Sequence, residues 1–228
     1  MNFTSAEFLL FFPIVLIVFR VLPPKTRWIL LLSASWAFYM SMNPSTGMLL
    51  LMATVSSYLA GIRIEDCRKE KAPGFKIQIW MCVGIGVPLA CLVLFKYAGF
   101  AAQSVSALAN VIGIHSVARL PRFVLPIGIS FYTFQTLSYV IDVRRGTIPA
   151  ERHFGFYALF VSFFPQLVAG PIERPGKLIP QLRYVCGMPN VPQARESFVS
   201  AGKDDLMAGL GLMLLGFFKK LVVADYLA

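Results

Sequence analysis

Four stretches of the chain contain no aspartate, glutamate, lysine or arginine, and they limit the possible folds more than any other feature. They are residues 28–62, 77–95, 123–141 and 153–172, which are 35, 19, 19 and 20 residues long. A helix needs roughly 20 apolar residues to cross a hydrocarbon core of about 30 Å. Only 14% of the 228 residues are charged, against roughly 25% in soluble domains. The sequence therefore predicts an all-α fold, a polytopic membrane helical bundle, and excludes an ordinary soluble domain.

The charge of the chain fits the same class. A formal net charge of +10 is also common in nucleic-acid-binding proteins, but here the basic residues lie in short clusters between the apolar runs. Membrane topology explains such clusters better, and we expect no nucleic-acid partner. The four cysteines lack CxxC spacing and a neighbouring histidine, so we expect neither a metal site nor a disulfide framework.

The 35-residue run is too long for one crossing, because as a single helix it would measure about 52 Å. The turn-forming residues 43–47, Asn-Pro-Ser-Thr-Gly, predict a hairpin with spans over 28–42 and 46–62. Basic residues flank these spans at 20–27 and 63–76, and the positive-inside rule places both clusters in the cytoplasm. With a retained first span over 8–19, the N-terminus is expected outside.

A fourth span is expected over 77–95, followed by the uncharged but more polar segment 97–124. We expect this segment to lie on the external surface as an interfacial helix. Residues 123–141 then cross inwards, and Arg144, Arg145 and Arg152 reach the cytoplasm. The alternative, in which the segment is itself a span, would place these arginines outside.

Simple span counting fails from His153 onwards. Pro165 interrupts the uncharged run after about 12 residues, which reach only about 18 Å as a helix, and Gly170-Pro171 ends it. Irregular backbone at membrane depth requires burial in protein or a water-filled cavity. We expect a broken or re-entrant element beside a cavity, with a proline-kinked span as the alternative. A polar loop over 173–205 and an apolar run over 206–218 follow, which gives about six to seven membrane segments.

Residue types suited to catalysis are few. The chain has two histidines, His115 and His153, and it has no Gly-rich phosphate loop and no HExxH motif. Ionisable groups beside irregular membrane backbone are candidates for function, and Glu173 and Arg174 occupy such a place. They are equally well explained as structural, since Glu173 can pair with Arg174 or Lys177.

Several motifs resemble a known family. They are LPIGISFYTFQ at 125–135 with YVIDV at 139–143, FFPQLVAGPIER at 163–174, FLLFFP at 8–13, WILLLSAS at 28–35 and GFFKKLVVADYLA at 216–228. Together they resemble the membrane-bound O-acyltransferase family, specifically its bacterial branch of alginate O-acetylation proteins. The resemblance extends over nearly the whole chain.

The resemblance implies a multi-pass enzyme of the bacterial inner membrane. Such an enzyme passes an acetyl group from acetyl-CoA or another acyl donor, which is a substrate and not a bound cofactor, towards an exopolysaccharide such as alginate. The implied partners are membrane lipid, a periplasmic acetyltransferase and the exopolysaccharide. An accompanying funnel through the membrane would be lined by candidates from the matched motifs: Gln135, Pro165, Gln166, Gly170, Pro171, Glu173 and Arg174.

The histidine that is essential in this family lies in a later membrane segment, beyond Ala228. The resemblance thus implies that residues 1–228 hold no catalytic residue. We expect one incomplete integral membrane domain, the N-terminal part of an acyltransferase, which is inactive alone and has a possible C-terminal half as partner. The alternative is a non-catalytic scaffold or inactive remnant that binds the acetylation machinery. A transporter is disfavoured, because no two similar halves with paired broken helices are seen.

Overall fold

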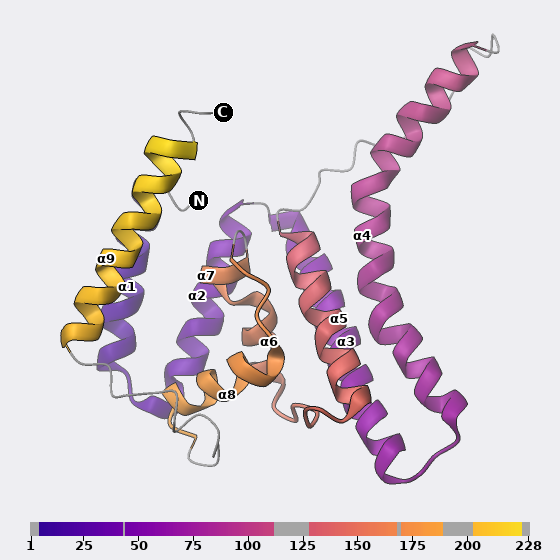
Figure 1. Ribbon diagram of the computed structural model, residues 1–228, viewed down its shortest axis with the longest axis horizontal. Coiled ribbons are helices and arrows are strands. Elements are labelled where there is room, and N and C mark those ends of the chain that lie inside the picture. The colour runs from indigo at the N-terminus through magenta and orange to yellow at the C-terminus, as the bar shows by residue number, and fades with distance from the viewer. Residues whose placement is uncertain (1–4, 43, 112–127, 168–169, 189–202, 225–228) are drawn as a thin grey trace.

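The computed structural model describes residues 5–42, 44–111, 128–167, 170–188 and 203–224. These residues form helices, and no strand occurs among them, which confirms the all-α class (Figure 1). The elements in chain order are α1 (Ala6–Val21), η1 (Pro24–Thr26), α2 (Arg27–Met42), η2 (Pro44–Thr46), α3 (Gly47–Lys69), α4 (Gly74–Val111), α5 (Ile129–Arg145), α6 (Phe154–Ser162), α7 (Phe164–Leu167), α8 (Pro175–Val185), α9 (Lys203–Phe218) and η4 (Lys219–Ala224).

The predicted break between two helices is present, while a membrane span over 28–42 stays a prediction. Helix α2 ends at Met42, the short 3-10 turn η2 begins at Pro44, and α3 begins at Gly47. Proline has no N–H to donate and therefore does not continue a helix from the preceding turn. The 35-residue uncharged run is thus divided where the turn residues stand.

Two helical stretches of the described chain are long and apolar enough to cross a membrane, namely Gly47–Lys69 and Gly74–Tyr97. Shorter apolar helices cover Phe154–Leu167 and Met207–Phe218. Length and composition therefore support a membrane protein, while six to seven membrane segments stay a prediction.

Helix α4 differs from the expectation of a span that ends at Phe95. It continues to Val111, so its 38 residues measure about 57 Å, and it has Pro88 inside. The residues after Phe95 are rich in alanine, the best helix former, which explains the continuation. Residues 97–111 are therefore not a separate element. Their position at an external membrane surface stays a prediction, and 112–124 lie outside the described residues.

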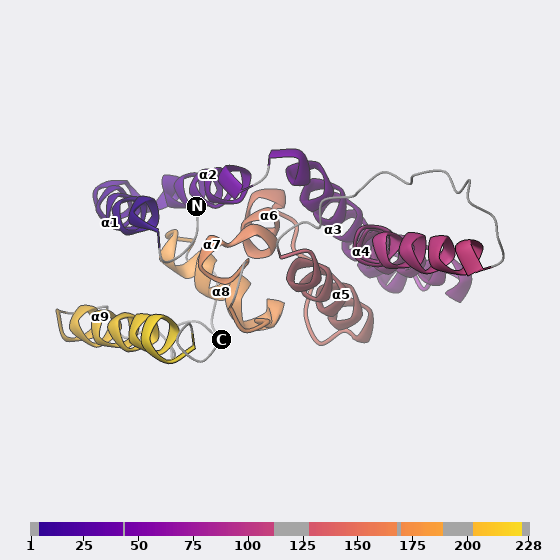
Figure 2. The same ribbon diagram turned by 90° about the horizontal axis from the view of Figure 1, so that it is seen from above.

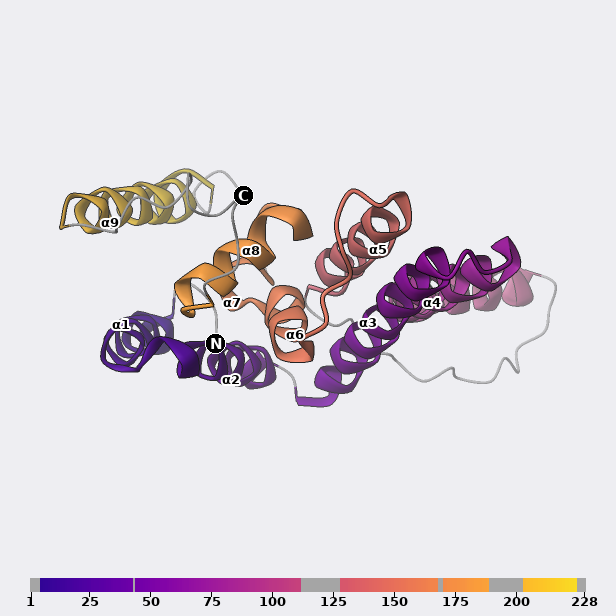
Figure 3. The ribbon, with the colours of Figure 1, turned by 90° about the horizontal axis from the view of Figure 1, so that it is seen from below.

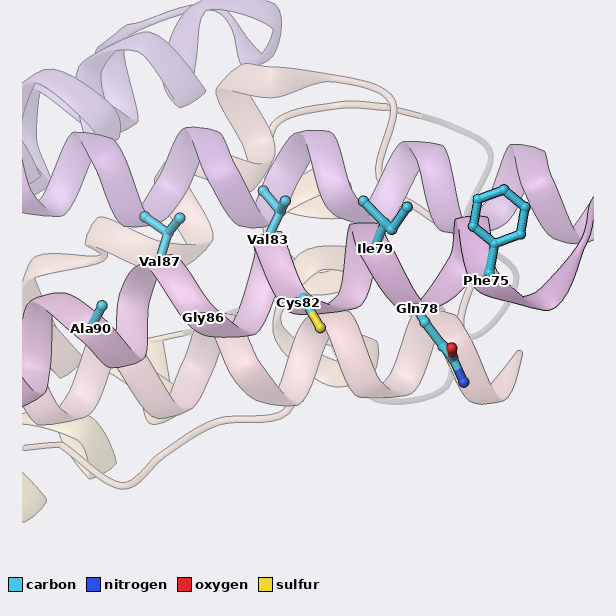
Figure 4. Close-up of a pocket in the computed structure, with 8 residues that line it drawn as sticks. All are labelled: Phe75, Gln78, Ile79, Cys82, Val83, Gly86, Val87 and Ala90. Atoms are coloured by element: carbon cyan, nitrogen blue, oxygen red, sulfur yellow. The ribbon is translucent and has the colours of Figure 1, made fainter.

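Helices α3, α4 and α5 pack together on one side of the molecule, and small residues allow their close approach (Figures 1 and 2). A Cβ atom added to Gly84 of α4 would lie 2.5 Å from the Cβ of Ala60 in α3 and 3.0 Å from Val140 in α5. The outward face of α4 carries a shallow hollow of about 560 Å³, lined by Phe75, Gln78, Ile79, Cys82, Val83, Gly86, Val87 and Ala90 (Figure 4).

Helices α6, α7 and α8 lie between α2 and α5 in all three views (Figures 1, 2 and 3). Helix α8 corrects the prediction of a polar loop over 173–205. It begins after the extended residue Arg174, has Pro175 at its first position, and buries Leu178, Ile179 and Leu182 along one face. This spacing of three and four residues is that of an amphipathic helix. Residues 189–202 of the predicted loop lie outside the described residues.

Candidate functional site

The predicted broken element is present. Helix α6 ends at Ser162, Phe163 leaves the helical conformation with φ −55° and ψ 108°, and α7 restarts at Phe164. The break therefore lies two residues before Pro165. Proline in the first turn of α7 sits where a helix makes no internal N–H bond, so it is compatible with the restart instead of causing the break.

A serine of α2 stabilises the break. The Ser35 hydroxyl accepts a hydrogen bond from the Phe164 N–H at 3.2 Å and donates one to the Leu31 carbonyl at 2.7 Å. Ser35 is fully buried, and residues 155–162 of α6 are buried on all sides. Protein atoms therefore surround the helix that leads into the break, while Phe163 at the break is half-buried and Pro165 is exposed. Burial in protein is one of the two environments that tolerate irregular backbone at membrane depth.

An apolar cavity of about 290 Å³ lies beside the break. It is bounded by α1, α2, α7 and α8, and Phe163, Phe164 and Pro165 line it. The Phe164 ring also packs edge-on against Phe8 and Phe11 of α1, with centroids 6.5 and 5.5 Å apart. The start of segment 163–174 thus borders a cavity, and the cavity is apolar.

Three of the candidate residues form one closed turn after α7. The Gln166 Nε2 donates to the Pro171 carbonyl at 3.0 Å, and the Gly170 N–H donates to the Gln166 carbonyl at 3.0 Å. A Cβ on Gly170 would lie 2.7 Å from the Gln166 Cα, so only glycine fits this approach. The Gln166 Oε1 is buried and makes no hydrogen bond to any residue that the structure describes.

The other candidates lie elsewhere. Gln135 of α5 is 2% exposed, and its Nε2 is 3.5 Å from the Phe160 carbonyl of α6. Arg174 is exposed and precedes α8, and its carbonyl accepts from the Lys177 N–H at 3.0 Å. Within the described ranges Glu173 has no ion pair with Arg174 or Lys177. The candidate residues are therefore spread over three places: the closed turn after α7, the contact between α5 and α6, and the segment just before α8.

The sequence analysis did not predict a group of charged residues where α3, α5, α6 and α8 meet. The connection between α5 and α6 lies at its centre. The Glu65 Oε2 of α3 accepts from the Ala150 N–H at 2.9 Å, and the Glu151 N–H is 3.0 Å from the Tyr139 hydroxyl oxygen of α5. We call this set, Glu65, Asp66, Tyr139, Glu151, Arg152 and Arg183, the polar junction.

Both buried carboxylates of the polar junction have cationic partners. Arg183 of α8 donates from Nε to Glu151 at 2.9 Å and from Nη2 to the second oxygen of the same carboxylate. Arg152 donates from Nη2 to Asp66 at 2.7 Å and to Glu65 at 3.4 Å. The hydrogen bond with the Asp66 carboxylate raises the pKa of Arg152. Charged residues next to apolar runs are usually paired, which predicts that partners exist but not which residues they are.

His153 packs between aromatic rings at the start of α6. Its ring centroid lies 5.0 Å from that of Trp28 and 5.1 Å from that of Phe156. The His153 N–H donates to Glu151 at 2.8 Å, while Nδ1 is buried and unpartnered within the described part of the chain. His115 lies outside the described residues. Among the residues that the structure describes, no group of three metal-binding side chains occurs.

Known proteins match the chain along its whole length. A probable alginate O-acetylase AlgI of Azotobacter vinelandii is 36% identical over all of the chain and 42% of its own length. The chain is homologous to part of the alginate O-acetylases. The corresponding protein of Pseudomonas aeruginosa is also 36% identical, over 41% of its length. A peptidoglycan O-acetyltransferase of Helicobacter pylori is 28% identical over 87% of the chain and 38% of its length.

The resemblance to the alginate O-acetylases inferred from the motifs is thereby confirmed. The chain spans less than half the length of these alginate O-acetylases, which is consistent with an N-terminal part. No family model matches the chain. No solved structure matches it either.

Proposed function

We propose that the chain contributes to O-acetylation of hydroxyl groups on an extracellular polysaccharide, as the N-terminal part of a membrane-bound O-acyltransferase. The observation that carries this proposal is the 36% identity to alginate O-acetylases along the entire chain. A peptidoglycan O-acetyltransferase among the relatives supports the reaction class, transfer of an acetyl group to a sugar hydroxyl, without fixing the polysaccharide.

Within this proposal the described residues build one wall of the reaction site. Helix α6, the break at Phe163 and the closed turn at Gln166 form a buried, irregular element with a cavity beside it. Acetyl transfer to a hydroxyl needs a base within hydrogen-bond reach of the attacking O–H. We propose that the base comes from the histidine segment that the resemblance places beyond Ala228, and that this chain positions the reactants. Positioning of this kind contributes several kcal/mol to a rate.

We further propose that the protein resides in the bacterial inner membrane with several crossings and an external N-terminus. The acyl donor, acetyl-CoA or another, would approach from the cytoplasm. A periplasmic acetyltransferase and the exopolysaccharide would be the partners outside. The basic clusters at 20–27 and 63–76, separated by an uncharged turn, support this orientation.

A chimera tests the function. The chain replaces the matching part of the Pseudomonas aeruginosa relative, and the chimera and the 228-residue chain alone are expressed in a strain that lacks this enzyme. Acetyl esters on the secreted polysaccharide are then quantified. We expect the chimera to restore acetylation and the chain alone to stay at background, because loss of a positioned acid or base costs about 10² to 10⁴ in rate.

The alternative function, a non-catalytic scaffold or inactive remnant, predicts a different pattern. In that case the chimera would accumulate in the membrane at the level of the intact relative, yet acetylate nothing. Turnover by the 228-residue chain alone that disappears on His153→Ala would instead show that the catalytic group lies within this chain.

A further inference from the structure

A cleft of about 440 Å³ opens beside the polar junction, and the proposed acetyl transfer gives it no role. Its walls are the connection between α5 and α6 and one face of α8. Thr147, Ile148 and Arg152 line it from the connection, and Ile179, Pro180 and Arg183 line it from the helix.

Two arginines give the cleft spare hydrogen-bond donors. Arg152 is half exposed and makes both of its ion pairs through Nη2, so Nε and Nη1 bond to no described residue. Arg183 binds Glu151 through Nε and Nη2, and its Nη1 has no hydrogen bond within the described ranges. An arginine fork with free donors matches the oxygens of a phosphate group.

The remaining walls are apolar. Ile148 and Ile179 face the cleft with Pro149 and Pro180 beside them. Glu151, the carboxylate that lines the cleft, is neutralised by its two bonds from Arg183. Both arginines are themselves ion-paired, Arg183 with Glu151 and Arg152 with Asp66 and Glu65, so the cleft offers unused guanidinium N–H donors and no excess positive charge. It combines these donors with an apolar wall, which suits a ligand that carries a phosphate on an apolar body.

The position of the cleft agrees with this chemistry. The uncharged part of α3 ends at Ile62, immediately before Arg63, and that of α5 ends at Ile141, before Asp142, Arg144 and Arg145. The cleft thus lies where two apolar segments give way to charge. In a bilayer this is the level of the phosphate headgroups.

We propose that this cleft binds a phosphate group attached to an apolar body, with Arg152 and Arg183 as its ligands. An anionic phospholipid of the membrane and a soluble nucleotide, whose aromatic base can pack on an apolar wall, share this chemistry. The proposal does not depend on the acetyl transfer, because it concerns binding by the 228-residue chain alone.

Thr147 provides matched variants for the test. It is exposed at the rim of the cleft, and its hydroxyl bonds only the Asp142 carbonyl at 2.9 Å. Thr147→Glu and Thr147→Gln both lose that bond and add side chains of the same size, but only glutamate adds a negative charge. Pro180→Glu and Pro180→Gln form a second pair on the opposite wall, for use if the first pair folds poorly.

Two probes distinguish the sources of the phosphate. Native mass spectrometry of the chain in neutral detergent measures retained phosphatidylglycerol against zwitterionic phosphatidylcholine, and calorimetry measures binding of ADP. We expect at least one anionic probe to bind, with about fivefold weaker affinity or more in Thr147→Glu and less than twofold change in Thr147→Gln. Phosphatidylglycerol binding indicates a lipid, and ADP binding indicates a soluble ester. The proposal is wrong if neither probe binds, or if the glutamate and glutamine variants bind equally.

Discussion

At the scale of single residues, Arg183 is the cation that stabilises the buried carboxylate of Glu151. Glu151 is 7% exposed, and Arg183 provides both of its charged hydrogen bonds. Arg183→Ala leaves this carboxylate buried without a cation, so we expect the chain to lose about 3 kcal/mol of unfolding free energy. Denaturant unfolding in detergent measures the loss. Lys69→Ala removes the 2.7 Å pair between the exposed Lys69 and the buried Glu65, which keeps its bonds from Arg152 and the Ala150 N–H, so this change should cost less than about 1 kcal/mol. Equal losses would contradict the prediction.

Ser35 is a second residue whose effect lies far from it in the sequence. Its hydroxyl accepts the Phe164 N–H at the break between α6 and α7. Ser35→Ala leaves that buried donor without a partner, which costs about 1–3 kcal/mol. Ser41→Ala is the matched control, because the Ser41 hydroxyl bonds only within its own helix, to Phe38. Thermal unfolding of both variants should place Ser35→Ala clearly below Ser41→Ala, and coincident melting curves would show that the serine does not support the break.

At the scale of helices, two glycines on α4 separate packing from helix propensity. Gly84 faces Ala60 of α3, whereas Gly86 has no atom within 4 Å of an added Cβ and lies on the outward face (Figure 4). Gly84→Ala overpacks the α3–α4 contact and should destabilise the chain by about 1–3 kcal/mol. Gly86→Ala should be neutral or stabilising by up to about 1 kcal/mol. The unfolding midpoints of both variants are measured in detergent. A decrease of similar size in both midpoints would contradict the prediction.

The sequence predicted those elements that depend on local chemistry. The hairpin break follows from the turn residues around Pro44. Pro165 and Gly170 predicted a broken element near the place where it occurs, although α6 already ends at Ser162. The exact position of the break was not predictable, because it involves a contact with Ser35, which lies 129 residues before Phe164. The polar junction joins residues 85 apart, such as Glu65 and Ala150, so no local pattern reveals it. Helix α8 was missed because Pro175, Gly176 and Pro180, residue types that are typical of loops, stand among its buried leucine and isoleucine residues.

At the scale of the whole molecule, the predicted orientation can be tested by cysteine labelling of intact cells. A cysteine introduced at residue 45 should react with a membrane-impermeant maleimide, and a cysteine introduced at residue 70 should not. The background needs Cys67 and Cys82 replaced, since neither is buried. Burial raises the pKa of the Cys186 thiol to about 11, so this thiol should react slowly with the maleimide. Cys186 can therefore be kept, and its labelling gives the background level. Labelling from outside at residue 70 but not at residue 45 would reverse the orientation.

The polar junction also imposes an order on biosynthesis. Glu65 lies 85 residues before Ala150, whose N–H donates to the Glu65 carboxylate, so the ribosome adds Glu65 to the chain first. At about 5–20 residues per second, translation leaves an interval of roughly 4–17 s. During this interval Lys69, one helical turn further along α3 and 2.7 Å from Glu65 in the finished fold, is the partner already synthesised. We therefore expect Lys69 to add little to the stability of the completed chain but to pair with Glu65 while the ribosome is still producing the rest of the site.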